Sequence, residues 1–340
     1  MTSTTTQAAA QHLQPVYQLV VGGRNITPTI DPRLIDLTLT ECRGDEADQL
    51  ELRLSDHDGA VELPSKGVTI SLQLGWAGQA LVDKGTFEVD EVEHSGTPDV
   101  ISIRARSADL GTSLRNRRDQ SWHGKSLGDI ITTIAKRHGL APRVDSKLAA
   151  QAIAHIDQTN ESDINFVTRL AKRYDAVATV KASRLLFMPI TGTTTSKGEA
   201  LPAITITRAD GDQHRYHSSN RDAYSGVRAY YHVAKKATRE GVLVGESGNA
   251  KRLRESYANE ADALAAAKAE WQRIQRGAAT LELTMAIGRP ELQPQTPVTV
   301  SGFKAQIDGT GWLTVKVTHS LSDGGLTSRA EFETGEAANT

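Results

Sequence analysis

Apolar and polar residues alternate in short segments near the C-terminal end of the chain. Leu281, Leu283 and Met285 are each separated by one polar residue, and segment 313–317 repeats this alternation. Successive side chains of a strand point to opposite faces, so the pattern predicts strands with one face on a core and the other in water. Glycine-rich turns lie between these segments. The stretch 276–333 is therefore expected to form a small antiparallel barrel or sandwich.

A second β-rich region lies toward the other end of the chain. Segment 35–39 alternates in the same way, and further segments of this kind follow it. About six or seven strands are expected, a number compatible with a small barrel. We assign this first barrel to residues 15–118. Strands expected within 201–235 are candidates to complete it, which would make the first barrel discontinuous. The region 201–250 is assigned to strands and a glycine-containing linker at 238–250.

Helical spacing replaces the alternation in the middle of the chain. Ser126 and Asp129 are expected to form a capping box, and apolar residues then recur every three or four positions. A second helix is expected to begin at Ser162, and a hairpin follows it over 177–188. Short helices flanked by strands predict a small α+β module, which we assign to residues 119–200.

One long helix is expected before the C-terminal strands. Asn259 provides its N-cap, a glycine ends it, and its alanine-rich apolar stripe includes Leu264 and Trp271. Such a helix can pack closely on its own barrel or on a neighbouring subunit, and packing in its own core is the favoured interpretation. We assign the long helix and the second barrel to residues 251–340. The predicted fold class is mainly β with an α+β insertion: two small antiparallel barrels, a helical module between them and one long helix.

Composition and charge narrow the classes of function. The chain has 39 Lys and Arg against 41 Asp and Glu, a net charge of −2, so it carries no global basic surface for nucleic acid. Its single cysteine, Cys42, cannot form an internal disulfide, which fits folding in a reducing cytoplasm. No segment approaches the roughly 18 apolar residues of a membrane-spanning helix. Residues 1–14 lack the features of a secretory signal and are expected to be a flexible tail.

The motifs point to no catalytic residue, cofactor or metal. Phosphate-loop, dinucleotide-binding, nucleophile-elbow and zinc-protease motifs are absent from the sequence. The carboxylates within 88–93 alternate with apolar residues, so they are interpreted as the solvated face of a strand. His214 and His217 are three residues apart without a third ligand nearby, which is weak evidence for a metal. A glycosidase carboxylate pair stays open, because counting acidic residues cannot exclude one.

Several short sequence motifs occur in a particular order along the chain. They are WHGKSL at 122–127, NESDINF at 160–166, YSGVRA at 224–229, GRPEL at 288–292 and WLTV at 312–315. In this order they resemble the phage late control protein D family, the tail hub of contractile-tailed phages and R-type pyocins. That family is similar to the hub part of type VI secretion spike proteins. The resemblance extends from about Val16 to Glu333.

The resemblance implies a homotrimer in which each subunit contributes two similar barrels to a pseudo-sixfold ring. Such a ring joins a hexameric tail tube to a trimeric spike. The implied partners are the chain itself, the spike protein, the tail tube protein and other baseplate proteins, with the tape-measure protein as a further candidate. The implied location is the tail baseplate of a virion or phage-like particle, assembled in the bacterial cytoplasm. Neither specific nucleic-acid recognition nor stable membrane insertion is expected.

Five residues are candidates for structural or interface roles within this hypothesis. Trp122 is interpreted as a core residue of the module, which is itself a candidate platform for baseplate proteins. Arg289 is expected to shape a turn at a barrel rim, and His319 is interpreted as a strand-face residue. The candidate set is Trp122, Leu264, Trp271, Arg289 and Trp312.

Two other functions remain as alternatives. A cell-wall hydrolase at the tail tip would use the open carboxylate pair. A late-gene transcription regulator would need a basic recognition helix, whereas the helix expected after Asn259 carries charges of both signs. The favoured hypothesis is a structural hub without enzymatic activity.

Overall fold

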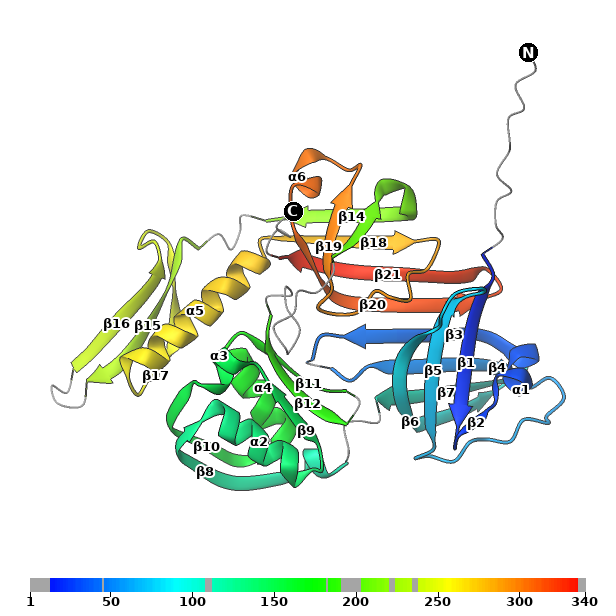
Figure 1. Ribbon diagram of the computed structural model, residues 1–340, viewed down its shortest axis with the longest axis horizontal. Helices are drawn as coiled ribbons and strands as arrows, with labels where there is room; N and C mark the ends of the chain where they lie inside the picture. The colour runs from blue at the N-terminus through cyan, green and yellow to red at the C-terminus, as the bar shows by residue number, and fades with distance from the viewer. Residues whose placement is uncertain are drawn as a thin grey trace, which may run out of the picture.

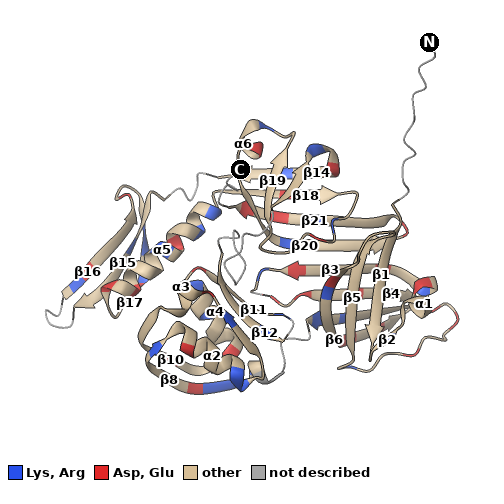
Figure 2. Cartoon of the chain, in the orientation of Figure 1, with Lys and Arg blue, Asp and Glu red and all other residues tan. Residues whose placement is uncertain are grey.

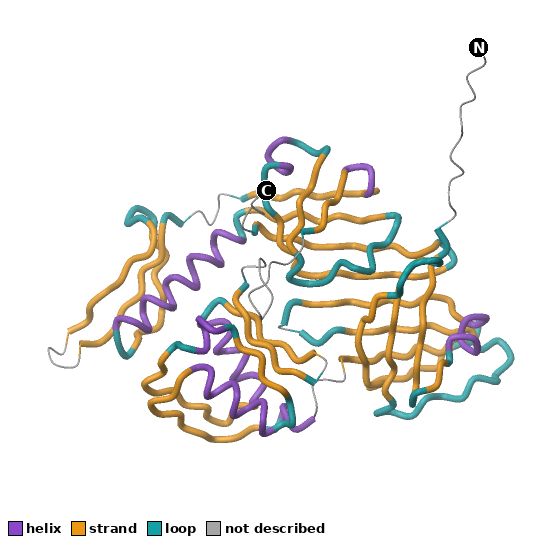
Figure 3. Tube along the Cα trace, viewed as in Figure 1, coloured by secondary structure: helices purple, strands orange, loops and turns teal. Residues whose placement is uncertain are grey.

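The computed structural model describes residues 13–44, 46–107, 112–181, 183–190, 203–219, 224–233 and 238–335 (Figures 1 and 3). The predicted fold class is confirmed, because strands dominate and the helices longer than four residues lie in the α+β module and directly before β18 (Ala279–Met285). Most of the tail predicted at residues 1–14 lies outside the described residues. Within those residues, none of the helices has the length and apolar character needed to cross a bilayer.

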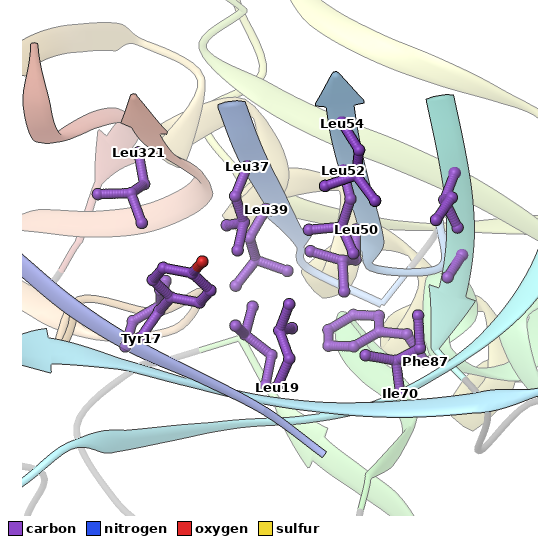
Figure 4. Close-up of a cluster of buried hydrophobic side chains, with 14 of the residues drawn as sticks. Tyr17, Leu19, Leu37, Leu39, Leu50, Leu52, Leu54, Ile70, Phe87 and Leu321 are labelled. Atoms are coloured by element: carbon purple, nitrogen blue, oxygen red, sulfur yellow. The ribbon is translucent and has the colours of Figure 1, made fainter. Parts of the chain in front are cut away.

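The first barrel encloses a core of aliphatic and aromatic side chains. Leucines of the strands β3 and β4 point toward Leu19, Ile70 and Phe87 on the opposite side of this core (Figure 4). Strands are hydrogen-bonded in the order β3-β4-β7-β6-β5-β1, and the short β2 (Arg24–Asn25) pairs with β1. The strands of the barrel are β1 (Pro15–Val21), β3 (Leu34–Cys42), β4 (Gln49–Ser55), β5 (Thr69–Trp76), β6 (Val82–Ser95) and β7 (Val100–Ser107). A short helix α1 (Thr27–Ile30) and a 3-10 turn (Asp31–Arg33) connect β2 to β3.

The second barrel is built from two separated parts of the sequence. Its core includes Trp312, Phe332 and Leu281, and its strands follow the order β14-β18-β21-β20-β19-β13. A 3-10 turn (Arg208–Asp210) joins β13 to β14, and α6 (Ala305–Asp308) precedes β20. The strands are β13 (Ile204–Thr207), β14 (Gly211–Ser218), β18 (Ala279–Met285), β19 (Pro297–Ser301), β20 (Trp312–Ser322) and β21 (Gly325–Thr334).

The two barrels have the same strand order. We number the six main strands of each barrel by their position in the sequence. Across the sheet, the strands of both barrels then follow the order first, fourth, fifth, sixth, third, second. This order is β1-β5-β6-β7-β4-β3 in the first barrel and β13-β19-β20-β21-β18-β14 in the second. The pairing between the first and fourth strands is antiparallel in the first barrel and parallel in the second. Both fifth strands also carry a bulge, next to Asp90 in β6 and next to Val315 in β20. Because strand order and bulge position coincide, we treat the barrels as two copies of one unit.

The same short sequence motif, Val-x-His-Ser, follows the bulge in both copies. Val92-Glu93-His94-Ser95 in β6 corresponds to Val317-Thr318-His319-Ser320 in β20. Val317 is buried in the core of the second barrel, Val92 is partly buried against the core of the first, and the residue after each valine is more exposed. This match gives a residue-by-residue equivalence between the two fifth strands.

The α+β module lies between the barrels in the sequence and packs its own core. Trp122, Phe166 and Phe187 are among its buried residues. Ser126 and Asp129 form the predicted capping box of α2, and Ser162 caps α4, so both predicted helix starts are confirmed. The module contains β8 (Arg117–Ser126), α2 (Leu127–Arg137), β9 (Ala141–Val144), α3 (Ser146–Ala149), β10 (Ala152–Ser162), α4 (Asp163–Arg173), β11 (Ala176–Lys181) and β12 (Arg184–Pro189), after a 3-10 turn (Thr112–Arg115).

A separate layer consists of one small sheet and the long helix. The helix α5 (Glu260–Arg276) begins after the predicted N-cap Asn259. Its alanine face, including Ala263 and Ala267, packs on a sheet of β15 (Gly226–Val233), β16 (Thr238–Gly245) and β17 (Ala250–Tyr257). In Figure 1 this layer lies at the side of the molecule away from the first barrel.

Three expectations about the β regions are wrong. The strands β13 and β14 complete the second barrel and not the first, because they pair with β19 and β18. The first barrel is therefore continuous, and it is the second barrel that is interrupted, by the β15–α5 layer. The expected linker at 238–250 contains β16, whose alternating valines pack on α5. Its glycines hide this pattern in the sequence.

Candidate functional site: the joint between the barrels

The two barrels are joined into one sheet by β20. The N-terminal part of β20 pairs with β19 inside the second barrel, while residues 316–322 extend beyond β19 and pair with residues 36–42 of β3. β21 lies on the other side of β20 throughout. The fifth strand of one copy is thus hydrogen-bonded to the second strand of the other. Leu321 and Leu326 pack in the core of the first barrel and so bury apolar surface at this joint.

A buried polar cluster lies inside the joint. Lys84 of β6 donates through Nζ to Glu41 Oε2 at 2.7 Å and to the Leu292 carbonyl at 3.3 Å. His319 of β20 lies beside this pair, with Nε2 3.4 Å from Glu41 Oε2. His319 is fully buried, and Glu41 and Lys84 are 3% and 7% exposed. A buried pair of this kind is costly to break, because the remaining charge has no water.

Both ring nitrogens of His319 have polar neighbours in the cluster. Ser328 Oγ accepts from the backbone N–H of Arg289 at 2.9 Å and lies 2.7 Å from His319 Nδ1. The other ring nitrogen, Nε2, lies 3.2 Å from Lys84 Nζ, 3.4 Å from Glu41 Oε2 and 3.3 Å from the Leu292 carbonyl oxygen.

The electrostatics of the cluster follow from burial and contact. Burial by itself raises the pKa of Glu41, but the hydrogen bond from His319 and the charge of Lys84 outweigh it and lower that pKa to about 2. Burial lowers the pKa of His319, against the opposing effect of Glu41. The lowered pKa favours the neutral form of His319, and burial also lowers the pKa of Lys84 against the opposing charge of Glu41.

The segment that contains Arg289 contacts both barrels. The Trp76 indole of the first barrel donates through Nε1 to the Gly288 carbonyl at 3.1 Å. The backbone of Gly288 lies so close to Leu326 that an added Cβ would be 2.7 Å from Cγ of that side chain. Only glycine fits there without displacement of the segment.

A second junction connects all the parts of the chain. Arg276, the last residue of α5, binds Asp175 of the module through two contacts of 2.5 Å and Glu333 of the second barrel at 2.9 Å. Arg43, which follows β3 of the first barrel, binds the same Glu333 oxygen at 2.5 Å. A cavity of about 600 Å³ adjoins this network. Its lining carries charges of both signs, so it favours neither an anion nor a cation.

The histidine pair considered for a metal does not converge. His214 and His217 both lie on β14, three residues apart, and therefore point to opposite faces of the strand. The ring of His214 instead contacts Phe303, with ring centroids 5.1 Å apart. Across the part of the chain that the structure describes, no group of three or more His, Cys, Asp and Glu side chains is arranged to hold a metal ion.

Comparison with known proteins identifies the family. A family model described as the phage tail baseplate hub (GPD) matches residues 46–325, more than half of the chain. The probable baseplate hub proteins of Escherichia phages 186 and P2 are each 42% identical to it, over 96% of this chain and 94% of each relative. The chain belongs to the phage tail baseplate hub family. The hub is accordingly a structural component of the tail baseplate of a phage particle, and the predicted family resemblance is confirmed.

Solved structures share the fold of the hub at low sequence identity. A tail protein from Neisseria meningitidis MC58 matches with a TM-score of 0.67 and 14% identity, over 94% of the hub and 96% of that chain. A component of the type VI secretion system of E. coli matches with a TM-score of 0.59 and 13% identity, over 94% of the hub and 77% of that chain. These likenesses concern the fold.

The five candidate residues are distributed over the hub and do not form one site. Trp122 is 4% exposed and stacks on Phe166 in the module core, with ring centroids 6.1 Å apart. Trp312 is buried in the second barrel and donates to the Ile307 carbonyl. Trp271 packs on the sheet beneath α5, whereas Leu264 is half-buried on the same helix and is not a member of that cluster. Arg289 reaches the joint through its backbone.

The local sequence does not identify the residues that hold the joint. His319 lies on a face of strand β20, and its ring is buried in the cluster with Lys84 and Glu41. The repeated motif Val-x-His-Ser is a sequence feature that indicates the duplicated barrel and marks the position of His319. Nothing in the local sequence around Lys84 or Arg276 marks a buried charge, because their partners are 43 and 101 residues away.

Proposed function

We propose that the hub forms a trimeric ring whose six barrels join a hexameric tail tube to a trimeric spike. The observation that carries this proposal is the shared strand order of the two barrels. A trimer of a chain with two equivalent barrels presents near-sixfold symmetry to a tube while it retains threefold symmetry for a spike. The implied partners are the hub itself, the spike and tube proteins and other baseplate proteins.

The joint within one chain provides the template for the joint between chains. Inside the chain, the fifth strand of the second barrel (β20) pairs with the second strand of the first barrel (β3). This joint does not use the fifth strand of the first barrel, β6, or the second strand of the second barrel, β14. Among the described residues, the outer edge of β14 and the edge of β6 from Asp90 to Ser95 have no strand partner. Unpaired edges of this kind invite pairing with another chain.

Pairing β6 of one subunit with β14 of the next repeats the internal joint between subunits. The equivalence of the two barrels also gives the register. Thr318 faces Thr40 within the chain, and the corresponding residues between subunits are Glu93 and His217. Three such joints close a ring in which the barrel strands form one continuous sheet.

The charges on the two open edges are complementary. The β6 edge presents Glu93 to β14, which carries Arg215 and two histidines, whereas Asp90 and Glu91 pair with Arg106 and Arg104 of β7 within the chain. Opposite charges on facing strands stabilise such pairs by a few tenths to about 1 kcal/mol each. This complementarity favours β14 of a second copy as the partner of β6.

The remaining parts of the chain fit a structural role. The α+β module, with Trp122 in its core, is assigned as a platform for other baseplate proteins, and no residue is assigned a catalytic role. For a transcription regulator, α5 would have to present a basic face, but its buried side packs on the β15 sheet and its ends carry both charge signs. Neither alternative function is favoured by a specific observation.

Light scattering tests the proposal on the full chain, alone and co-expressed with the neighbouring spike protein. A mass of three subunits in either sample supports the ring. A monomer in both samples would remove the physical basis of the symmetry adaptor, although the two-barrel fold would stand.

A further inference from the structure

One face of the small sheet in the β15–α5 layer carries a group of arginines. The side chains that alternate away from α5 are Arg228 and Tyr230 on β15, Arg239 and Leu243 on β16, and Arg252 on β17. We call this surface the arginine face. Figure 2 shows basic residues on these strands, and Figure 3 shows the helix on the other side of the sheet.

Tyr230 organises the centre of the arginine face. Its ring lies over Gly241, where an added Cβ would come within 3.2 Å of the ring. The guanidinium carbons of Arg239 and Arg252 lie 5.1 Å and 4.6 Å from the ring centroid. Cation–π contacts of this kind hold the guanidinium groups near the sheet and restrict their rotamers, so less entropy is lost when an anion binds.

Among the residues that the structure describes, no ion pair compensates the positive charge of this face. Arg228 and Arg252 are directly opposite each other on neighbouring parallel strands, and like charges in such positions destabilise a sheet. Within the described residues, neither these two arginines nor Arg239 makes an ion pair. Glu240 lies next to Arg239 in sequence, but its carboxylate accepts a hydrogen bond from Tyr231 on the face toward α5.

Exposed arginines on the barrel strands behave differently. Arg53 pairs with Asp36 at 2.8 Å, and Arg329 pairs with Glu282 at 2.8 Å, in both cases across neighbouring strands. The arginine face thus retains an unfavourable charge arrangement that a carboxylate from outside the chain would relieve.

We propose that the arginine face docks an acidic segment of another protein, with its carboxylates on Arg228 and Arg252 and an apolar side chain on Leu243. Arginine and tyrosine are enriched at the energetic centres of protein interfaces, and Leu243 adds an exposed apolar contact, 36% accessible. A nucleic-acid surface needs a longer basic track, and the net charge of this chain is −2. The proposal is independent of the ring, because the face lies on the β15–α5 layer and not on a barrel edge.

Fluorescence anisotropy on the full chain tests this assignment. The probes are a short fluorescein-labelled peptide of Glu and Asp around one Leu, and a single-stranded DNA of equal charge. The double variant Arg228→Gln/Arg252→Gln should bind the peptide about tenfold more weakly or worse. Tyr230→Leu should also weaken binding several-fold, although it changes no charge. The matched control Arg53→Gln/Arg329→Gln removes the same charge and should bind as the parent does.

Three results would overturn the assignment. They are no peptide binding by the parent, an equal loss in the control variant, and tighter binding of the DNA than of the peptide. The solution mass of the Arg228→Gln/Arg252→Gln variant should equal that of the parent. Failure of this proposal is therefore distinguishable from failure of the trimeric ring.

Discussion

Arg276 binds both carboxylate oxygens of Asp175, although the two residues are 101 positions apart and belong to different parts of the fold. The Asp175 side chain is 4% exposed and that of Arg276 12%. Because Arg276 also contacts Glu333, one guanidinium group connects α5, the module and the second barrel. The relative positions of these parts are therefore expected to depend on this residue.

Replacement of Arg276 should therefore destabilise the whole chain. Arg276→Ala leaves the Asp175 carboxylate buried without its partner, and a loss of about 3 kcal/mol in the free energy of unfolding is expected. Arg276→Lys should recover only part of it, because a lysine cannot bind both oxygens in a planar fork. Urea unfolding measures the change. Arg329→Ala is the control, since its ion pair with Glu282 is exposed and is expected to contribute about 1 kcal/mol or less. Equal effects of the two alanine variants would show that Arg276 is not a connecting residue.

The buried histidine predicts a pH dependence of stability. His319 has a lowered pKa in the folded chain, so between that pKa and 6.5 the unfolded chain binds more protons than the folded one. Stability contributed by such a group is present above pH 6.5 and is lost as the pH falls below it. Glu41, whose pKa is lowered to about 2, loses its contribution only at lower pH, from 4.5 downward.

Urea midpoints measured from pH 7.5 to pH 5 should thus fall with pH in the parent, with a slope of at most about 1.4 kcal/mol per pH unit from this group. The variant His319→Gln should have a flatter profile, because the titrating group is gone. Parallel profiles for the two chains would contradict a neutral, buried His319.

The long helix should be needed for tail assembly. A charge at Trp271 disrupts the contact between α5 and its sheet, and a charge at Leu264 occupies a half-buried position of the same helix. Trp271→Glu and Leu264→Glu are therefore expected to stop the formation of complete tails, as counted by electron microscopy. Gln272→Glu introduces the same charge at an exposed position of α5 and should leave assembly unchanged. Normal tails from the Trp271 variant would exclude a structural role for the helix.

Local patterns in the sequence predict the local structure well. Ser126, Asp129, Ser162 and Asn259 cap helices where their spacing indicates, because capping depends only on residues within one turn. Alternation likewise locates most barrel strands. These signals are local, and so are the structures that they specify.

The assignment of strands to barrels could not be predicted in this way. β14 and β18 pair over a gap filled by a complete sheet and helix, and nothing in either strand specifies its partner. The Lys84–Glu41 pair depends on the same long-range arrangement. The repeated motif around His94 and His319 does relate distant parts of the sequence, because it marks equivalent positions in two copies of one barrel.

Disulfide crosslinking tests the central claim most directly. In a Cys42→Ser background, Glu93→Cys and His217→Cys place one cysteine on each open edge, at positions expected to face each other between subunits. Facing residues of antiparallel strands lie about 4.5–5.5 Å apart, within reach of a disulfide. The control pair Glu93→Cys and Tyr216→Cys points to opposite faces of the sheet. The ring predicts covalent dimers and trimers on a non-reducing gel for the first pair and monomers for the control. Monomers for both pairs, from a sample that light scattering shows to be trimeric, would contradict the proposed pairing of β6 with β14.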